Sequence, residues 1–168
     1  MHNTRQGDMT DEEVTQCLLD LETWFKSNCE ELGNVYAQTP PASDDAIKEL
    51  ESSLEGGQID SVLKSLLLAH DGNMPVYSST TLSAKKILEA RSEILSSDKG
   101  GGGMVPFAID GEGDYLVLHE KGVSTWSKSE GLGMVESPSL ASYLEKYRDE
   151  MLRGKLEYIE GCGVVDVV

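Results

Sequence analysis

Three carboxylates at alternating positions, Asp110, Glu112 and Asp114, come closer than any other residues of this chain to a metal-binding spacing. Carboxylate oxygens are the ligands that calcium and magnesium prefer. An EF-hand loop also needs glycine at its sixth position and glutamate at its twelfth, where this chain has Tyr115 and Lys121. The segment therefore predicts a structural turn, and we assign no metal ligand.

Nucleophilic and acid–base catalysis find little support in the sequence. The histidines His2, His70 and His119 lie far apart, and neither a Gly-x-Ser-x-Gly elbow nor a Cys–His signature is present. The glycines of 100–103 lack the Gly-Lys-Ser/Thr ending of a phosphate-binding loop. We expect no enzyme and no cofactor; a metal enzyme built on the three carboxylates is the least favoured alternative.

The cysteines favour a reducing compartment. Cys17, Cys29 and Cys162 are odd in number and form no Cys-x-x-Cys pair. Free thiols are typical of the cytoplasm, and the nucleus or an organelle interior fits equally well.

Acidic charge is the strongest compositional feature. The 168 residues contain 30 acidic and 14 basic side chains, for a net charge of −16. This argues against binding to nucleic acid or to an anionic membrane surface, and no apolar run approaches the ~20 residues of a membrane span. We expect a soluble protein.

The charge is uneven along the chain. Residues 1–60 have 14 acidic and 3 basic side chains, a net charge of −11. Such an excess either keeps the protein soluble or steers a partner with a basic surface. Under the second interpretation, we expect outward-pointing acids on the N-terminal helix and its surroundings to bind the partner: Asp11, Glu12, Asp20, Glu22, Glu30 and Glu31.

Apolar residues at helical spacing predict five helices. The first begins at the capping-box pair Thr10 and Glu13 and is expected to end near Leu32. The next two lie between the cap Ser43 and the glycines 56–57, and between the cap Asp60 and the pair 71–72. The last two cover 82–95 and a segment that opens at 137–138, with Pro138 as its first helical residue.

Short apolar runs separated by turns predict an antiparallel meander of residues 104–109, 115–119 and 123–126. A short strand at 75–77 and a further one at 134–135 are candidates, whereas 96–103 and 131–133 are predicted to be loops. The β-branched run 164–168 is expected to dock on the domain or on a partner as an edge strand.

The order of these segments resembles the SUKH superfamily, the Smi/Knr-type cell-wall-regulator domain. The stretches that carry the resemblance are 40–54, 63–72, 105–118, 123–126 and 138–144, and Val105 to Leu118 is the most specific of them. The chain departs from the family pattern at Ile59-Asp60-Ser61, at Asp71-Gly72 and at Ser127-Lys128-Ser129. These differences bear on the subfamily more than on the fold.

The resemblance implies an α+β fold with a twisted, mainly antiparallel sheet flanked by helices. It also implies that the characteristic residues are structural: Asp71, Gly72, Pro106, Phe107, Gly113, Asp114 and Trp126. Glycine permits the turn, Asp114 is expected to bond its backbone, and Trp126 to pack between sheet and helix.

The expected organisation is a polar arm at 1–9, one domain at 10–153 and a docked tail at 154–168. The family resemblance implies a non-catalytic protein-interaction domain, here an accessory or regulatory subunit of a larger assembly. The alternative is an immunity protein that neutralises a basic nuclease toxin.

Overall fold

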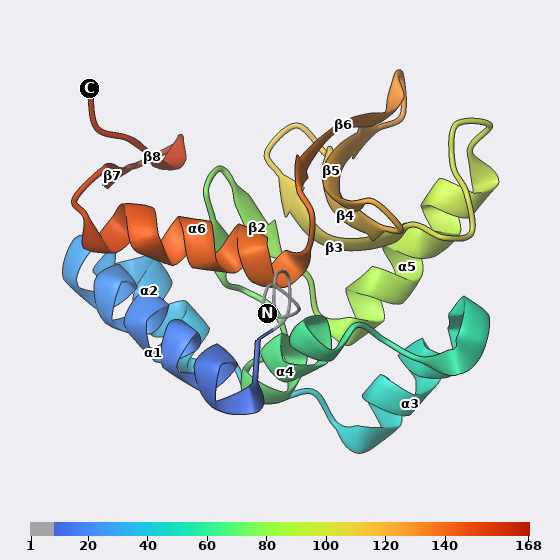
Figure 1. Ribbon diagram of the computed structural model, residues 1–168, viewed down its shortest axis with the longest axis horizontal. Coiled ribbons are helices and arrows are strands. Elements are labelled where there is room, and N and C mark those ends of the chain that lie inside the picture. Colours follow the sequence, from blue (N-terminus) through green and yellow to red (C-terminus); the bar gives the residue numbers. More distant parts are fainter. Residues whose placement is uncertain (1–8) are drawn as a thin grey trace, which may run out of the picture.

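The computed structural model describes residues 9–168, which form six α-helices, a six-stranded antiparallel sheet and a separate two-stranded hairpin (Figure 1). The sheet strands lie side by side in chain order: β1 Pro75–Val76, β2 Ser79–Thr81, β3 Val105–Asp110, β4 Tyr115–His119, β5 Gly122–Ser127 and β6 Gly131–Ser137. The predicted α+β class and the antiparallel meander are confirmed.

Side-chain caps set the starts of most helices. Thr10, Ser43, Asp60, Ser83 and Ser139 each accept a hydrogen bond from a backbone N–H group in the first helical turn. The helices are α1 Asp11–Asn28, α2 Glu30–Gln38, α3 Asp44–Ser53, α4 Ser61–Ala69, α5 Ala84–Ser96 and α6 Leu140–Leu152, with a 3₁₀ turn at Glu55–Gly57.

The helices divide into two groups around the sheet (Figure 1). Helix α5 packs against β3 and α3, whereas α6 packs against β5, β6 and α1, and α1 also contacts α2 and α4. Tyr115 and Trp126, which pair across β4 and β5, face α5, because the Tyr115 hydroxyl donates to Glu93 of that helix. Their neighbours Leu116 and Thr125 therefore face the side of α6.

The C-terminal residues form a hairpin, β7 Leu156–Ile159 and β8 Gly163–Asp166. Its β8 strand lies next to the turn that follows β1, where the Val164 N–H donates to the Tyr77 carbonyl at 3.0 Å. Leu156 and Val164 are buried. The β-branched tail is thus paired with a strand of its own hairpin in addition to its contact with the β1–β2 turn.

The predicted N-terminal helix from Thr10 to Leu32 is wrong in one respect, because the chain breaks at Cys29 into α1 and α2. Cys29 has non-helical angles, φ −149° and ψ 68°. Helix α2 then packs closely against the end of α1, where a Cβ on Gly33 would lie 3.0 Å from the Lys26 nitrogen. Gly33 permits this close packing and does not end the helix.

Two predictions near the end of the sheet are also wrong. Gly131 and Gly133 belong to β6, because the turn after β5 is short and Gly131 already pairs with Ser127. Pro138 is not the first residue of α6, since the Ser139 hydroxyl caps the Ser142 N–H and the helix begins at Leu140. At the opposite edge of the sheet, the strand predicted at 75–77 ends at Val76, and the sequence did not predict β2.

The glycine-rich loop, predicted at 96–103 and found at 97–104 between α5 and β3, is attached to the domain at two points. Buried Arg91 donates one hydrogen bond to the Gly102 carbonyl and another to the Ser53 carbonyl, both at 2.8 Å. The Trp126 indole N–H donates to the Lys99 carbonyl at 3.0 Å. The charge of Arg91 strengthens its hydrogen bonds, which join α3, α5 and this loop.

Candidate protein-binding groove

A groove of about 490 Å³ opens between α6, the sheet and the C-terminal hairpin. We call it the α6 groove. It is lined by the turn after β1, by residues of the sheet and of its 110–114 turn, by one face of α6 and by β8: Val76, Tyr77, Ser78, Ser79, Asp110, Asp114, Tyr115, Leu116, Thr125, Glu136, Tyr143, Lys146, Glu150, Val164, Val165 and Asp166.

Tyr77 joins the three walls of the α6 groove. Its hydroxyl donates to Glu150 of α6 at 2.7 Å, and its carbonyl accepts the hydrogen bond from Val164 of β8. Its ring lies 4.5 Å from that of Tyr147, whose hydroxyl in turn donates to the Pro75 carbonyl. Tyr77 adopts φ 54°, a left-handed conformation that is uncommon outside glycine and that its three contacts hold in place.

Negative charge dominates the lining of the α6 groove. Among the described residues, five carboxylates line it, on Asp110, Asp114, Glu136, Glu150 and Asp166, together with one cation, Lys146. Three of the five are oriented by hydrogen bonds. Asp110 accepts from two backbone N–H groups of its own turn, Glu136 accepts from the Thr125 hydroxyl at 2.8 Å, and Glu150 accepts from Tyr77. Such carboxylates offer their remaining lone pairs to cationic donors.

The hydroxyl groups of the α6 groove remain neutral. Burial, together with the hydrogen bond and the charge of Glu150, raises the pKa of Tyr77 well above its ordinary value. Burial and the nearby Glu136 also raise the pKa of Tyr143. The hydroxyls of Tyr77 and Tyr143 are therefore protonated at neutral pH, and that of Tyr77 donates to Glu150. Neither histidine nor cysteine is among the described residues that line the groove.

The 110–114 turn brings its three carboxylates together, with one oxygen of each within 4.8 Å of the others. Asp110 Oδ1 accepts from the N–H groups of Glu112 and Asp114 at 2.9 and 3.0 Å, so this oxygen already organises the turn. Asp114 was expected to bond the backbone of the turn; in the part of the chain that the structure describes, the side-chain acceptor of these two bonds is Asp110. Gly113 has φ 89°, as the turn requires.

The other residues that the family resemblance predicted to be structural lie at a helix start, at a register shift or in the core. The Asp71 carboxylate accepts from the Ala84 N–H at the start of α5, and a Cβ on Gly72 would lie 2.8 Å from the Ser83 nitrogen. Pro106 stands where the pairing of β3 with β4 shifts register, a position that tolerates a residue without an N–H. Phe107 and Trp126 are buried.

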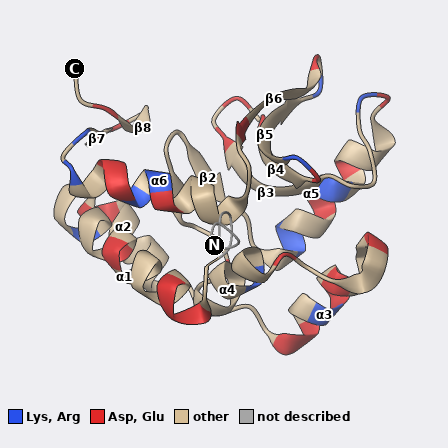
Figure 2. Cartoon of the chain, in the orientation of Figure 1, with Lys and Arg blue, Asp and Glu red and all other residues tan. Residues whose placement is uncertain are grey.

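The acidic residues predicted to bind a partner spread along α1 and the start of α2 and do not form one cluster; Figure 2 shows acidic segments on several elements. Asp11, Glu12, Glu30 and Glu31 are exposed, and Asp20 accepts a hydrogen bond from Gln16. The residues that hydrogen-bond in the α6 groove were missed, because they come from segments far apart in the sequence. Only the spacing of Tyr143, Lys146 and Glu150 on one helix could have indicated a shared face.

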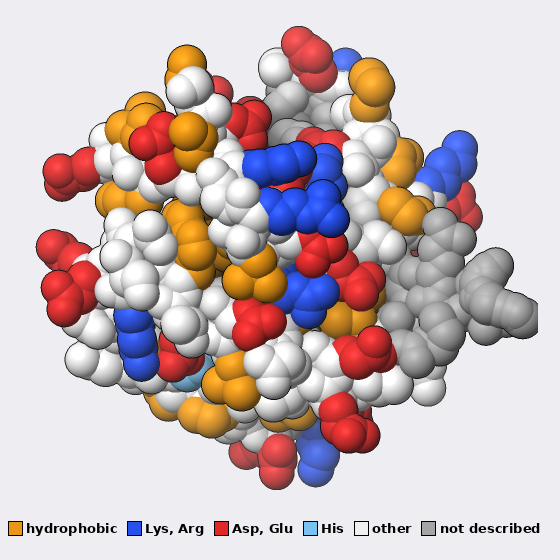
Figure 3. Space-filling view, turned by 60° about the vertical axis from the view of Figure 1, so that its left-hand side comes forward, with side chains coloured by type: hydrophobic (Ala, Val, Ile, Leu, Met, Phe, Trp, Pro, Cys, Tyr) orange, Lys and Arg blue, Asp and Glu red, His pale blue; other side chains and the backbone are white. Residues whose placement is uncertain are grey.

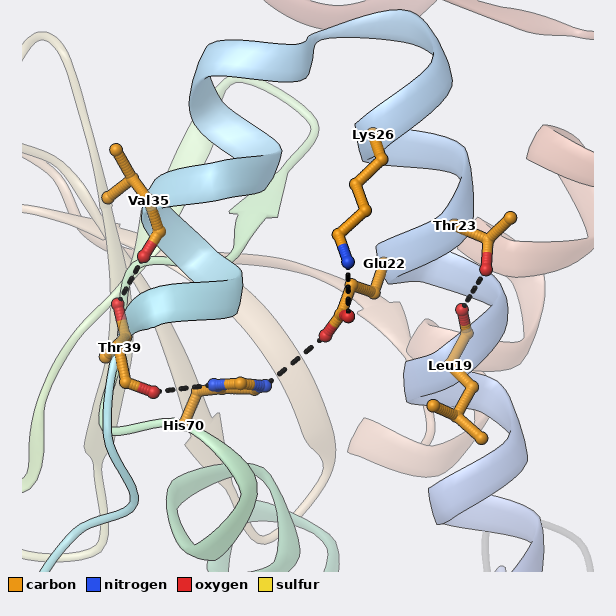
Figure 4. A network of polar contacts seen from close by, with 7 residues as sticks. All are labelled: Leu19, Glu22, Thr23, Lys26, Val35, Thr39 and His70. Carbon is orange, nitrogen blue, oxygen red and sulfur yellow. Dashed lines mark hydrogen bonds and ion pairs between the residues drawn. The ribbon is translucent and has the colours of Figure 1, made fainter.

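Glu22 was expected to point freely into solvent, but its carboxylate lies in a network of polar contacts with neighbouring side chains (Figure 4). Its carboxylate lies 3.2 Å from Lys26 Nζ and 3.4 Å from His70 Nε2, and His70 Nδ1 donates to the Thr39 carbonyl at 2.6 Å. The network connects α1 with the ends of α2 and α4. Glu22 also borders a second, more apolar groove of about 350 Å³ between α1 and α4.

Cys17, Cys29 and Cys162 are free thiols, and the first two are buried. Among the described residues, no helix combines the length and hydrophobicity needed to cross a membrane.

The model of one protein family, described as the SMI1 / KNR4 family (SUKH-1), matches residues 41–146. The match covers more than half of the chain and extends from the loop before α3 into α6. Among curated proteins, no match is found.

Proposed function

The chain belongs to the SMI1/KNR4 (SUKH-1) family, and from this we propose that it is a non-catalytic domain that binds a basic segment of a protein partner in the α6 groove. Family members are generally non-catalytic and commonly bind protein partners such as toxins. In our proposal this protein serves as an accessory or regulatory subunit of a larger assembly.

The observation that carries the proposal is that, in the part of the chain that the structure describes, five carboxylates and one lysine line the α6 groove. The face of the molecule seen in Figure 3 mixes basic and acidic side chains. A groove with a local excess of negative charge focuses the field and attracts lysine and arginine side chains.

Charge in the α6 groove affects selectivity and association rate more than affinity. An exposed ion pair contributes only about 0–1 kcal/mol, whereas complementary charge speeds the encounter and disfavours acidic competitors. The aromatic rings of Tyr77 and Tyr143 add apolar area to the groove. We therefore expect a partner segment with lysine or arginine beside apolar residues.

The exposed acids of α1 and α2 form a second candidate contact area, the helical face: Asp11, Glu12, Glu30 and Glu31. In the proposal this face contributes long-range attraction, because its carboxylates are open to solvent. Asp20 and Glu22 contribute less, since each is already bonded within the chain.

Affinity purification followed by zero-length carbodiimide cross-linking tests the proposal. The partner is identified by mass spectrometry, purified, and cross-linked to this protein, so that only carboxylates in contact with partner amines react. We expect partner lysines to be joined to Glu136, Glu150 or Asp166. Cross-links confined to the helical face would contradict binding in the α6 groove.

An immunity protein against a basic nuclease toxin is the alternative, favoured by the common role of the family. The same groove would then hold a basic segment of the toxin. If expression of the partner kills cells and co-expression of this protein keeps them alive, the immunity alternative is supported. Co-purification of this protein within a stable multi-subunit complex supports the accessory subunit instead.

A further inference from the structure

Strand β6 is the open edge of the six-stranded sheet. The opposite edge, β1, lies beside β8 of the C-terminal hairpin. Within the part of the chain that the structure describes, the backbone of residues 132–136 has no hydrogen-bonding partner other than β5. Backbone groups along such an edge are a template for a further strand.

Strand β6 protects this edge only weakly. Natural edge strands commonly carry lysine, proline or β-bulges; β6 contains neither lysine nor proline, and its protection is limited to the charge of Glu136 and two register shifts in its pairing with β5. Instead it exposes three apolar side chains: Met134 is 87% exposed, Val135 46% and Leu132 37%. Because the outer backbone groups of β6 lack a strand partner among the described residues and its exposed side chains are apolar, pairing with an added strand is favoured over exposure of this edge to water.

The two faces of β6 differ in chemistry. Leu132 pairs with Trp126 and Val135 with Ser124, and the register of β5 with β6 shifts between these two pairs. Because of this shift, Leu132 and Val135 follow Trp126 and Ser124 onto the α5 side of the sheet, although they are three residues apart. Glu136 accepts a hydrogen bond from Thr125 and lines the α6 groove, so its carboxylate lies on the opposite side. A strand added to β6 would present one face to apolar residues and the other to the acidic groove.

We propose that an extended segment of a protein partner, with apolar residues alternating with lysine or arginine, adds to β6 as a seventh strand. Its apolar side chains pack beside Leu132 and Val135, and its basic side chains point toward Glu136 and the α6 groove. This inference rests on the proposed function and adds the mode of docking. A second copy of the chain does not fit, because each copy has a net charge of −16 and brings its own Glu136 to the same edge.

Peptide probes of about ten residues test the inference. One probe alternates valine with lysine, a second contains the same residues as a valine block and a lysine block, and a third alternates valine with glutamate. Nuclear magnetic resonance titration follows the amides of residues 131–137 and their hydrogen exchange. We expect the alternating basic probe alone to shift these amides and slow their exchange.

Variants then locate the binding. Val135→Lys and Leu132→Lys should each weaken binding of the alternating basic probe at least about tenfold. The matched control is Ile159→Lys, which changes an exposed apolar strand residue of the hairpin and should leave binding within about twofold. Circular dichroism melting confirms that each variant is folded.

Two results would overturn strand addition without affecting the proposed function: equal binding of the block and alternating basic probes, or shifts in groove residues with unchanged exchange in β6. Equal binding of the valine–glutamate probe at β6 would instead refute the role of the acidic groove. A dimer in sedimentation that Val135→Lys dissociates would assign the edge to a second copy and would also overturn the inference.

Discussion

Gly163→Ala tests how the C-terminal hairpin closes one wall of the α6 groove. A Cβ at this position would lie 2.5 Å from the Tyr77 carbonyl oxygen and 2.9 Å from Ser78 Cα. Because real Cβ atoms do not approach other atoms so closely, β8 must move away from the β1–β2 turn. Gly161 provides the matched control, since it also has positive φ, 86° against 102°, but no atom lies within 4 Å of the place that its added methyl group would occupy.

Both substitutions lower the free energy of unfolding through backbone strain, but only Gly163→Ala also disrupts contacts of β8. An alanine in left-handed conformation costs about 1–2 kcal/mol at either position. Only Gly163→Ala also disrupts the Val164–Tyr77 hydrogen bond, worth about 0.5–1.5 kcal/mol, and exposes the buried Val164 side chain, worth about 1.5–3 kcal/mol when fully exposed. We expect Gly163→Ala to destabilise the protein by about 2–4 kcal/mol more than Gly161→Ala.

Thermal melting and hydrogen exchange measure this difference. For a chain of this size, about 2–4 kcal/mol corresponds to roughly 5–15 °C in melting temperature. The Val164 amide should exchange much faster in Gly163→Ala than in Gly161→Ala, because its acceptor is lost. Equal melting temperatures together with equal protection of this amide would refute the close packing of β8 against Tyr77.

Three further predictions concern other parts of the fold. Asp71→Ala removes the side-chain acceptor at the start of α5 and should lower the unfolding free energy by about 0.5–2 kcal/mol in urea, whereas Asp98→Ala at an exposed position should not. Burial raises the pKa of Cys17 to about 11, so a thiol reagent at pH 8 should label the exposed Cys162 rapidly and Cys17 only after denaturation; rapid labelling of both would contradict the burial. Calorimetric titration with calcium, magnesium and manganese should give no binding tighter than about millimolar at the 110–114 turn, and stoichiometric micromolar binding would identify a metal site there instead.

Local signals in the sequence predicted much of the secondary structure. The caps Thr10, Ser43 and Asp60 mark helix starts because a side-chain oxygen close in sequence accepts from the first turn. The turn at 110–114 follows from its glycines and its aspartates. These interactions join residues only a few positions apart, so the sequence alone displays them.

Long-range packing decided the elements that the sequence did not predict. The break at Cys29 depends on how α2 packs against α1 through Gly33, and β2 forms because β3 lies beside it. The α6 groove likewise requires Tyr77, Glu150 and β8 to meet. Contacts of this kind leave no regular spacing in the sequence. The sequence therefore predicted a site among the acidic residues of the N-terminal helices, which are close together along the chain.

Association kinetics with the purified partner test the central claim, binding in the α6 groove, most directly. Two variants each remove three negative charges. The groove variant carries Glu136→Gln, Glu150→Gln and Asp166→Asn, and the variant of the helical face carries Glu12→Gln, Glu30→Gln and Glu31→Gln. The association rate constant is measured from about 0.05 to 0.5 M salt, where the Debye length falls from roughly 14 to 4 Å.

We expect the groove variant to slow association several-fold at low salt and to flatten its salt dependence, because the charges that meet the partner are gone. The variant of the helical face should change the rate less, although its net charge is the same. Association of the groove variant at the wild-type rate, with an unchanged salt dependence, would contradict the claim that the α6 groove binds the partner.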